Sequence, residues 1–213
     1  MYKRYVSNNV IRRIPRYLRK LEELQADGFT RISSAEFGKM LGLTPSQIRQ
    51  DLSHFGEFGQ QGYGYDIDHL SNELRKVVGM DQGYKAILVG VGNIGRALID
   101  KFSFNEWGIH LECAFDIDRS IVGTECNGVQ ILPTNTLENY LLRNPIDIAV
   151  LCVPSGEAIQ MARRLTENGI EAIWNFTNIE IVEPYSNILV ENIHFSDSLL
   201  NLSYYLTEQR GSK

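Results

Sequence analysis

The sequence predicts an α/β protein with two domains, a small helical domain followed by a larger one built around a parallel sheet. Residues 85–98 form an apolar run, a glycine-rich turn and a helical pattern, which indicate a β-strand leading into a helix. Residues 33–54 carry two short helical patterns, each with its own N-terminal capping signal. Later in the chain, apolar runs alternate with helical patterns, as in folds with a parallel sheet. We place the first domain at residues 1–80, the second at 81–195 and a separate C-terminal helix at 196–213.

The composition of the 213 residues is that of a globular protein, with 43% hydrophobic residues and a net charge of −5. The charge is unevenly distributed, because residues 1–60 hold ten Lys or Arg against six Asp or Glu, whereas residues 61–213 hold eleven against twenty. A basic first domain favours a polyanionic partner, although a solvated helix surface gives the same count.

No apolar run approaches the roughly 20 residues needed to cross a bilayer, and the start of the chain lacks the apolar segment of a signal peptide. We therefore expect a cytoplasmic protein with no membrane partner. The three cysteines share no paired or metal-binding spacing, so neither a disulfide framework nor a metal site is expected.

The glycine-rich turn at residues 90–95 has the G-x-G-x-x-G spacing of a dinucleotide-binding unit. Gly90 permits the tight turn, Gly92 lets the backbone approach a pyrophosphate, and Gly95 lets the helix pack closely on the strand. Asp116 ends the next apolar run, where its carboxylate can accept hydrogen bonds from a ribose 2′-hydroxyl. These features predict a Rossmann domain that binds NAD(H) in preference to NADP(H). The alternative is a Rossmann-shaped domain whose pocket is empty or repurposed.

The nicotinamide end of such a site lies where the later strands end, because ligands of an open parallel sheet bind across the carboxyl ends of its strands. Two pairs of residues fall there, Val153-Pro154 and Asn175-Phe176. Pro154 and Phe176 are candidate apolar walls for the ring, although a loop proline and a core aromatic are equally good interpretations of the spacing.

The two short helices of the first domain predict a helix-turn-helix. The first has the S-x-x-E capping box of Ser33 and Glu36, and the second begins with Thr44 as its cap and Pro45 as its first residue. The second helix of such a unit lies in a DNA major groove, with its exposed side chains at bases or phosphates. We assign this role to Ser46, Gln47, Arg49 and Gln50. The same pattern also occurs in purely structural three-helix domains.

Residues 56–65 alternate glycine with polar and aromatic residues, a pattern typical of a tight hairpin. After a helix-turn-helix, this pattern predicts the wing of a winged-helix domain, which can approach a DNA minor groove. We assign Gln61, Gly62 and Tyr63 to that contact, although the wing offers no Lys or Arg.

None of the four histidines has an acid or a nucleophile at a spacing that indicates catalysis. A dehydrogenase also adds a substrate domain that carries a general acid or base, and the second domain leaves no room for one. We therefore expect that the protein is not an enzyme, with a small NAD-dependent oxidoreductase as the rival hypothesis.

The C-terminal helix carries apolar residues over most of its circumference, so it should be buried on several sides. It would pack either on its own domain or into a second subunit. The second arrangement gives a two-fold dimer that suits a palindromic DNA site.

Taken in order, the motifs resemble those of the Rex family of redox-sensing transcriptional repressors. The matching segments are RQDLS at 49–53, FGEFG at 55–59, GYGY at 62–65, GVGNIGRAL at 90–98, CVP at 152–154 and NF at 175–176. The resemblance implies a homodimer with winged-helix heads, Rossmann bodies and exchanged C-terminal helices. Such a dimer binds operator DNA and is released when NADH rises, whereas NAD+ competes for the same pocket without releasing the DNA.

The resemblance also implies a DNA contact for Ser53 and a nicotinamide contact for Phe195 of the partner subunit. The cofactor-binding residues that we expect are Gly90, Val91, Gly92, Asn93, Ile94, Gly95, Asp116, Val153, Pro154, Asn175, Phe176 and Phe195.

Six positions depart from the pattern of that family. Gln50 and Gln61 stand where the family has cations that reach phosphates, so DNA affinity or operator sequence is expected to differ. The other four lie in the nicotinamide and dimer-switch region of the family and are Lys101, Thr177, Asn178 and His194. A Rex-like DNA-binding regulator with an altered or lost redox response, or with a nucleotide kept as a fixed structural part, is therefore a further alternative.

Overall fold

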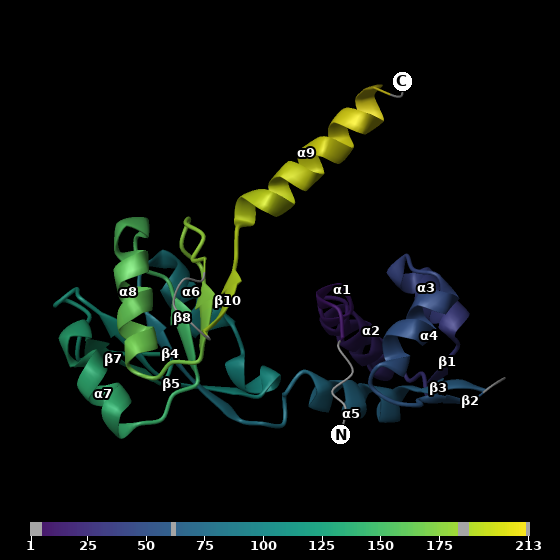
Figure 1. Ribbon diagram of the computed structural model, residues 1–213, viewed down its shortest axis with the longest axis horizontal. Helices are drawn as coiled ribbons and strands as arrows, with labels where there is room; N and C mark the ends of the chain where they lie inside the picture. The colour runs from purple at the N-terminus through teal and green to yellow at the C-terminus, as the bar shows by residue number, and fades with distance from the viewer. Residues whose placement is uncertain (1–5, 61–62, 183–187, 212–213) are drawn as a thin grey trace. The chain divides into compact units, whose positions relative to one another are not determined.

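The computed structural model describes residues 6–60, 63–182 and 188–211. The chain divides into two compact units, Met1–Gln82 and Gly83–Lys213, which we call the head and the body. The head consists of short helices and a small sheet, and the body is built around a large sheet (Figure 1).

The head has the elements of a winged-helix domain. Its described helices are α1 (Asn8–Ile11), α2 (Ile14–Ala26), α3 (Ser34–Leu41), α4 (Pro45–Ser53) and α5 (Ile67–Val77). Its described strands are β1 (Arg31–Ile32), β2 (Gly59–Gln60) and β3 (Gly64–Asp66), which form an antiparallel sheet in the order β1-β3-β2. Strands β2 and β3 form the predicted hairpin of the wing. Gln61 and Gly62, which separate these strands in the sequence, lie outside the described residues.

Apolar residues recur three or four positions apart from Ile11 to Leu24, which predicts one helix over residues 11–24 with Pro15 tolerated in its first turn. The structure has two helices there instead. Helix α1 ends at Ile11, and α2 begins at Ile14 with Pro15 in its first turn. Proline lacks an N–H group, and inside a helix its ring clashes with the carbonyl group four residues earlier, which here belongs to Ile11. The helix therefore cannot continue through Pro15, and the chain starts a new one.

Both helices of the helix-turn-helix begin as predicted. Ser33 and Glu36 form a reciprocal capping box at the start of α3, and Gly42 ends this helix with a left-handed φ of 69°. The Thr44 hydroxyl accepts a hydrogen bond from the backbone N–H of Gln47 at 3.2 Å, which caps α4.

The core of the head fixes which face of α4 points outward. Ile48 and Leu52 are buried in the core with Tyr17 and Phe37, as the four-residue spacing of the first two predicts. The remaining face of α4 is consequently left to solvent.

The body is a doubly wound α/β domain, as predicted. Its sheet has the order β10-β9-β8-β4-β5-β7-β6, and each pair of neighbours is parallel except β6 and β7. The strands are β4 (Tyr84–Val89), β5 (Ile109–Asp116), β6 (Glu125–Cys126), β7 (Val129–Pro133), β8 (Ile148–Leu151), β9 (Ala172–Asn175) and β10 (Leu189–Asn192). The sequence did not predict the edge strand β6, because two residues are too few to show an alternating pattern.

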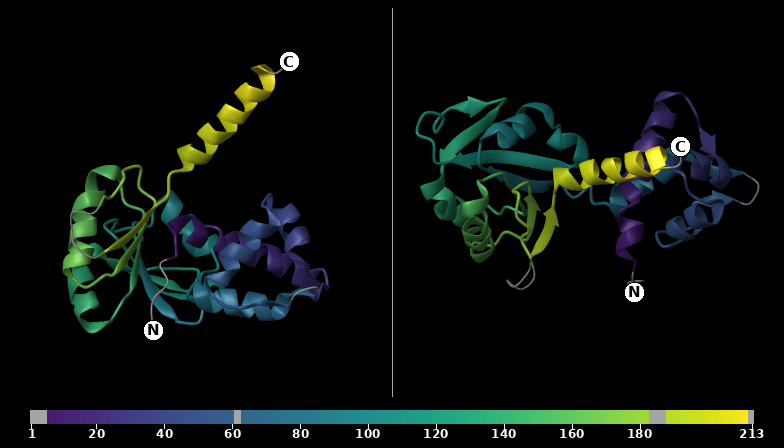
Figure 2. Two further views of the ribbon diagram at one scale, coloured as in Figure 1. Left: turned by 45° about the vertical axis from the view of Figure 1, so that its right-hand side comes forward. Right: turned by 90° about the horizontal axis from the view of Figure 1, so that it is seen from above.

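Helices cover both faces of this sheet (Figure 2). One face packs against α7 (Leu137–Arg143) and α8 (Ser155–Glu167), and the other packs against α6 (Asn93–Lys101). The described residues of the body also form two short 3-10 helices, η1 (Phe104–Trp107) and η2 (Thr134–Thr136). Adjacent strand residues point to opposite faces of the sheet. Val89, Phe115 and Leu151 therefore belong to the core under α7 and α8. Their neighbours Leu88, Ala114 and Val150 belong to the core under α6.

The C-terminal helix α9 (Phe195–Gly211) has no buried side chain. Its leucines and tyrosines are largely exposed, with Leu200 at 66% and Tyr205 at 68%. The sequence predicted a helix buried on several sides, and packing onto its own domain is not what the structure shows. An exposed apolar surface of this kind marks an interaction site.

Candidate nucleotide site and DNA-facing surface

The glycine-rich turn joins β4 to α6 at the carboxyl end of the sheet. Gly90 has a φ of 98°, and a Cβ atom there would lie 2.7 Å from the carbonyl carbon of Cys152. A Cβ atom on Gly95 would lie 2.0 Å from the carbonyl oxygen of Gly90. Neither position accepts a side chain, so the fold itself requires both glycines.

Gly92 has no such reason to be glycine. A Cβ atom there would meet no atom within 4 Å, and its φ of −72° is open to any residue. Gly92 is the N-cap of α6, which no side chain caps, so the N–H groups of the first helical turn can bind an anion. A ligand that approaches the backbone therefore explains this glycine, as the sequence predicts.

The other residues of the turn surround this N-terminus. Val91 is buried, whereas Asn93 and Ile94, the first two residues of α6, are exposed beside Gly92. Their backbone N–H groups belong to the same uncapped turn.

The Asp116 carboxylate is held against the glycine-rich turn. It accepts hydrogen bonds from the backbone N–H of Val91 at 2.6 Å and from that of Asp118 at 2.8 Å. The sequence placed Asp116 at the end of β5 but did not predict its bond to Val91. A carboxylate oxygen has two acceptor sites, so the partly exposed group can still accept a bond from a ribose hydroxyl.

The candidate nicotinamide residues lie at the ends of β8 and β9. Val153 and Pro154 lead from β8 into α8. The N–H of Cys152, just before them, donates to the Val89 carbonyl oxygen at 2.8 Å, which holds this segment beside the glycine-rich turn. Phe176 follows β9 and belongs to a row of aromatic rings, with its centroid 4.6 Å from that of Trp174 and 6.3 Å from that of Phe195.

Asn175 is fully buried, and its side chain is fully hydrogen-bonded within the protein. Its amide donates to the Ile179 carbonyl oxygen and to Asn192 Oδ1, both at 2.8 Å. Its carbonyl oxygen accepts from the N–H and the hydroxyl of Thr177, at 3.0 and 2.7 Å. The side chain therefore fixes the loop that carries Phe176.

The DNA-facing assignments fall on the outer surface of α4 and the wing. Ser46, Arg49, Gln50 and Ser53 are exposed, and Gln47 is partly exposed. Tyr63 of the wing is 70% exposed. The hydroxyl of Ser53 also donates to the Gln50 carbonyl oxygen at 2.7 Å. The two remaining assignments, Gln61 and Gly62, lie outside the described residues.

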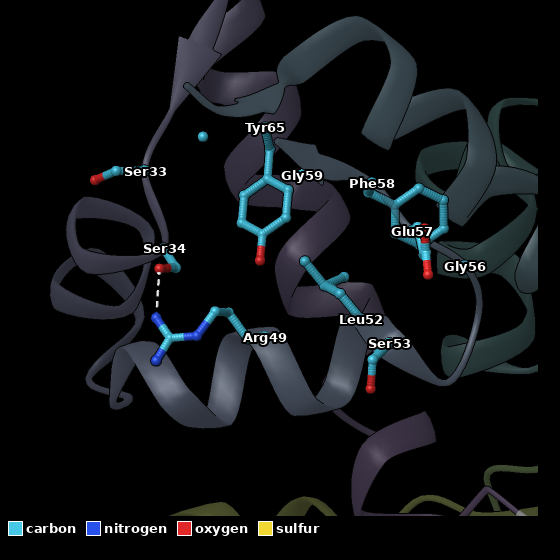
Figure 3. Close-up of a pocket in the computed structure, with 11 residues that line it drawn as sticks. Ser33, Ser34, Arg49, Leu52, Ser53, Gly56, Glu57, Phe58, Gly59 and Tyr65 are labelled. Carbon is cyan, nitrogen blue, oxygen red and sulfur yellow. Dashed lines mark hydrogen bonds between the residues drawn. The ribbon is translucent and has the colours of Figure 1, made fainter. Parts of the chain in front are cut away.

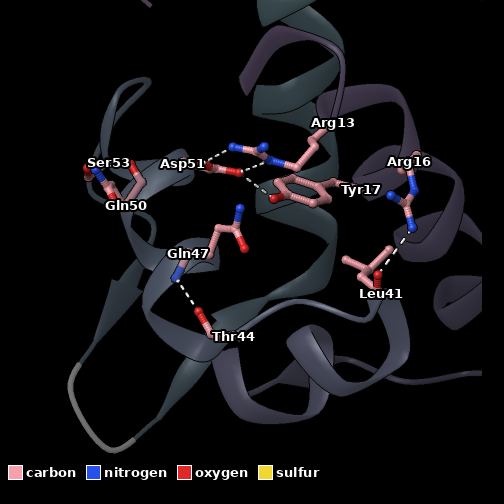
Figure 4. A network of polar contacts seen from close by, with 9 residues as sticks. All are labelled: Arg13, Arg16, Tyr17, Leu41, Thr44, Gln47, Gln50, Asp51 and Ser53. Atoms are coloured by element: carbon pink, nitrogen blue, oxygen red, sulfur yellow. Dashed lines mark hydrogen bonds and ion pairs between the residues drawn. The ribbon is translucent and has the colours of Figure 1, made fainter. Parts of the chain in front are cut away.

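A buried ionic group anchors α4, the predicted recognition helix of the helix-turn-helix, from its inner side (Figure 4). Asp51 is 2% exposed and accepts hydrogen bonds from Arg13 Nε at 2.6 Å, from Arg13 Nη2 at 2.8 Å and from the Tyr17 hydroxyl at 2.5 Å. Sequence reasoning missed this group. The available signal was an acidic residue three positions after Ile48, on the apolar face of the predicted helix.

The ionisation of this group follows from its contacts. Burial opposes the charge on Asp51, but the hydrogen bonds from Arg13 and Tyr17 outweigh it and lower the pKa of the carboxyl. Burial raises the pKa of Tyr17, and its hydrogen bond to Asp51 raises that pKa further. The group is therefore an Arg cation, a carboxylate and a neutral phenol at neutral pH.

Comparison with known proteins gives matches over almost the whole chain. Residues 5–53 match the family described as "Putative DNA-binding protein N-terminus", and residues 81–179 match the family "CoA binding domain". The redox-sensing transcriptional repressor Rex of Thermoanaerobacter sp. (strain X514) is 46% identical over 97% of this chain and 92% of that protein. The repressor of the same name from Clostridium tetani is 42% identical over 97% of this chain and 98% of that protein.

The chain belongs to the Rex family. Rex proteins are transcriptional repressors, so the family membership favours a regulator over the rival oxidoreductase. Solved structures agree with this assignment. RSP in complex with β-NAD+ and operator DNA is 46% identical, with a TM-score of 0.90 over 98% of this chain and 95% of that one. RSP in complex with β-NADH is 43% identical, with a TM-score of 0.89 over 98% of this chain and 97% of that one.

The four residues that depart from the family pattern in the body differ in how far they are buried. Thr177 is buried and bonded to Asn175, Asn178 is exposed, and His194 is partly exposed just before α9. Lys101 is exposed at the last position of α6. Among the described residues, no helix is long and apolar enough to cross a membrane, and no group of His, Cys, Asp and Glu could hold a metal ion.

Proposed function

We propose that this Rex protein is a transcriptional repressor that binds operator DNA and leaves it when NADH occupies the body. The observation that carries the proposal is Gly92, a glycine that the fold does not need, at an uncapped helix N-terminus in a chain that also has an exposed recognition helix. The 46% identity to RSP, whose solved complex contains both β-NAD+ and operator DNA, supports both halves of the proposal.

The first turn of α6 would hold the pyrophosphate through backbone N–H groups, with Asp116 at the adenosine ribose. Val153, Pro154 and Phe176 would line the nicotinamide end, and Asn175 would act by holding the loop of Phe176 in place. The nicotinamide ring carries a positive charge in NAD+ and none in NADH, so apolar walls favour the reduced ring.

The described residues of α9 support a homodimer. Seventeen residues of helix without one buried side chain need a partner, and a second copy of the same helix supplies an apolar surface of equal extent. Phe195 of the same chain lies beside Phe176 in the structure, and exchange of α9 would replace it there with Phe195 of the partner subunit. A two-fold dimer matches a palindromic operator, with recognition helices about 34 Å apart. A cytoplasmic location is part of the same proposal.

The bodies of the dimer would close when NADH binds, and the two recognition helices would lose the spacing that one turn of DNA demands. The ligand can shift this equilibrium only by its difference in affinity for the two states. NAD+ would occupy the same site without driving the closure.

The test begins with selection of duplexes from a randomised palindrome library by the full-length chain, followed by gel shifts of the selected duplex with NAD+ and NADH in separate lanes. Release by NADH alone is the expected result. Equal release by both nucleotides, or by neither, would contradict redox sensing. A nucleotide that stays bound through purification without releasing DNA would indicate the fixed structural cofactor.

A further inference from the structure

Arg49 lines a pocket in the head that shares no lining residue with the nucleotide site. The pocket has a volume of about 680 Å³ and lies between the N-terminus of α3, the C-terminal half of α4 and the wing. Its lining includes Ser34, Arg49, Ser53, Phe58 and Tyr65 (Figure 3). Because Arg49 is also exposed, its guanidinium lies at the boundary between the pocket and solvent.

Two hydroxyl groups from different helices hold this guanidinium. Nη1 donates to Ser34 Oγ at 3.0 Å, and Nη2 donates to Ser46 Oγ at 3.3 Å. Ser34 is the first residue of α3, and Ser46 lies in the first turn of α4. Contacts at both terminal nitrogens fix the orientation of the planar group, and a single contact would leave it free to rotate.

The held guanidinium keeps its capacity to bind DNA. It has five N–H donors, of which these two contacts use two. A guanine needs two donors, for O6 and N7, so a complete base contact remains available. Each serine hydroxyl also keeps its own proton, which can be donated to a phosphate of the same groove.

We propose that Ser34 is a positioning residue that presets Arg49 for a guanine in the operator. A long side chain that is already ordered loses less conformational entropy on binding, so presetting raises affinity for the base that fits the preset orientation. A different base cannot use that orientation, and presetting therefore acts on specificity. This inference rests on the proposed DNA-binding function.

The test compares full-length variants on the selected duplex and on its complete set of single base-pair substitutions, with affinities measured by fluorescence anisotropy. The unmodified chain should prefer guanine over the other bases at one position of each half-site, and in Arg49→Ala this preference should fall by about tenfold or more. In Ser34→Ala, preference at the same pair should fall by about three- to tenfold, with the other positions unchanged. Ser34→Thr, which keeps the hydroxyl, should restore the original profile.

Ser33→Ala is the matched structural control, because the Ser33 hydroxyl forms the α3 capping box with Glu36, whereas Arg49 contacts the neighbouring Ser34. It should lower the melting temperature without changing the base profile. The inference would be overturned if Ser34→Ala kept the original profile, if it weakened all duplexes equally, or if Ser33→Ala relaxed the same position. Failure of the unmodified chain to select any duplex would instead overturn the proposed function itself.

Discussion

Arg13 and Asp51 are joined by two parallel hydrogen bonds, from Nε to Oδ2 at 2.6 Å and from Nη2 to Oδ1 at 2.8 Å. Arg13 immediately precedes α2, and Asp51 lies on the recognition helix α4. The two-point contact therefore fixes the rotation of α4 about its own axis, and Tyr17 adds a third bond to the same carboxylate. Together with the buried side chains of Ile48 and Leu52, this group determines which side chains of α4 face outward.

Substitution of Arg13 and substitution of Asp51 should destabilise the head by different amounts. Arg13→Met leaves the Asp51 carboxylate buried without its cation, at a cost of about 3 kcal/mol. Asp51→Asn should cost less, because the side chain of Arg13 is 21% exposed and can be hydrated. Denaturant unfolding at pH 7 measures both values. Equal stability of Arg13→Met and the unmodified chain would show that the pair contributes nothing.

Stability should also depend on pH through Asp51. Its pKa is lowered in the folded protein, so the unfolded chain binds this proton more tightly. The stabilisation is therefore fully present above the ordinary carboxyl pKa of about 3.9 and is lost as the pH falls through the lower folded value. Melting temperatures from pH 7 to pH 3 should fall more steeply for the unmodified chain than for the double variant Arg13→Met, Asp51→Leu. Parallel curves would refute this assignment.

Substitutions at two glycines of the turn should have different effects, one on nucleotide binding and the other on folding. Gly92→Ala places a methyl group in open space, so the melting temperature should stay within about 2 °C of the original while affinity for NAD(H) falls about tenfold or more. Gly95→Ala places the same methyl group 2.0 Å from a backbone oxygen and should impair folding. Calorimetry and nucleotide titration of the two variants give both readouts. Undiminished nucleotide affinity in Gly92→Ala would remove the main support for the site.

The negative charge of Asp116 should weaken the binding of NADP+, whose ribose carries a 2′-phosphate. Asp116→Asn removes the negative charge but keeps an oxygen that can accept the bond from the Val91 N–H. NAD+ affinity should fall by less than about tenfold, while the preference for NAD+ over NADP+ should decrease because the repulsion is gone. Titration of both nucleotides by calorimetry checks the ratio. An unchanged ratio would mean that Asp116 only supports the turn.

Removal of α9 should convert a dimer to a monomer. A chain ending at His194 loses the exposed apolar residues of the helix and no buried side chain. The body should therefore stay folded while the mass measured by light scattering is halved. A milder variant, Leu200→Glu with Tyr205→Glu, places charges on the same surface and should weaken the dimer without shortening the chain. A dimer that survives both changes would place the interface elsewhere.

Local sequence patterns were sufficient to predict most of the fold. The capping box of Ser33 and Glu36, the cap at Thr44 and the glycine-rich turn each depend on neighbours within a few residues, and each is confirmed. Pro15 misled the prediction, because a proline tolerated in the first turn of a helix also prevents that helix from starting earlier.

Contacts between distant residues could not be predicted in this way. Arg13 and Asp51 are 38 positions apart, and Val91 and Asp116 are 25 apart. A local pattern shows that Asp51 lies on an inward face, but the partner that compensates its charge comes from another helix. The hydrogen bonds of Asn175 likewise depend on how β9, β10 and the loop between them pack together.

If the ratio of NADH to NAD+ controls DNA binding, a titration at varied ratio should show it. The full-length chain on its selected operator is held at a constant total concentration of nucleotide while the NADH fraction rises, and anisotropy reports the bound DNA. We predict that the bound fraction falls steadily as the NADH fraction rises. A bound fraction that depends on total nucleotide alone, and stays constant across every ratio, would contradict the account.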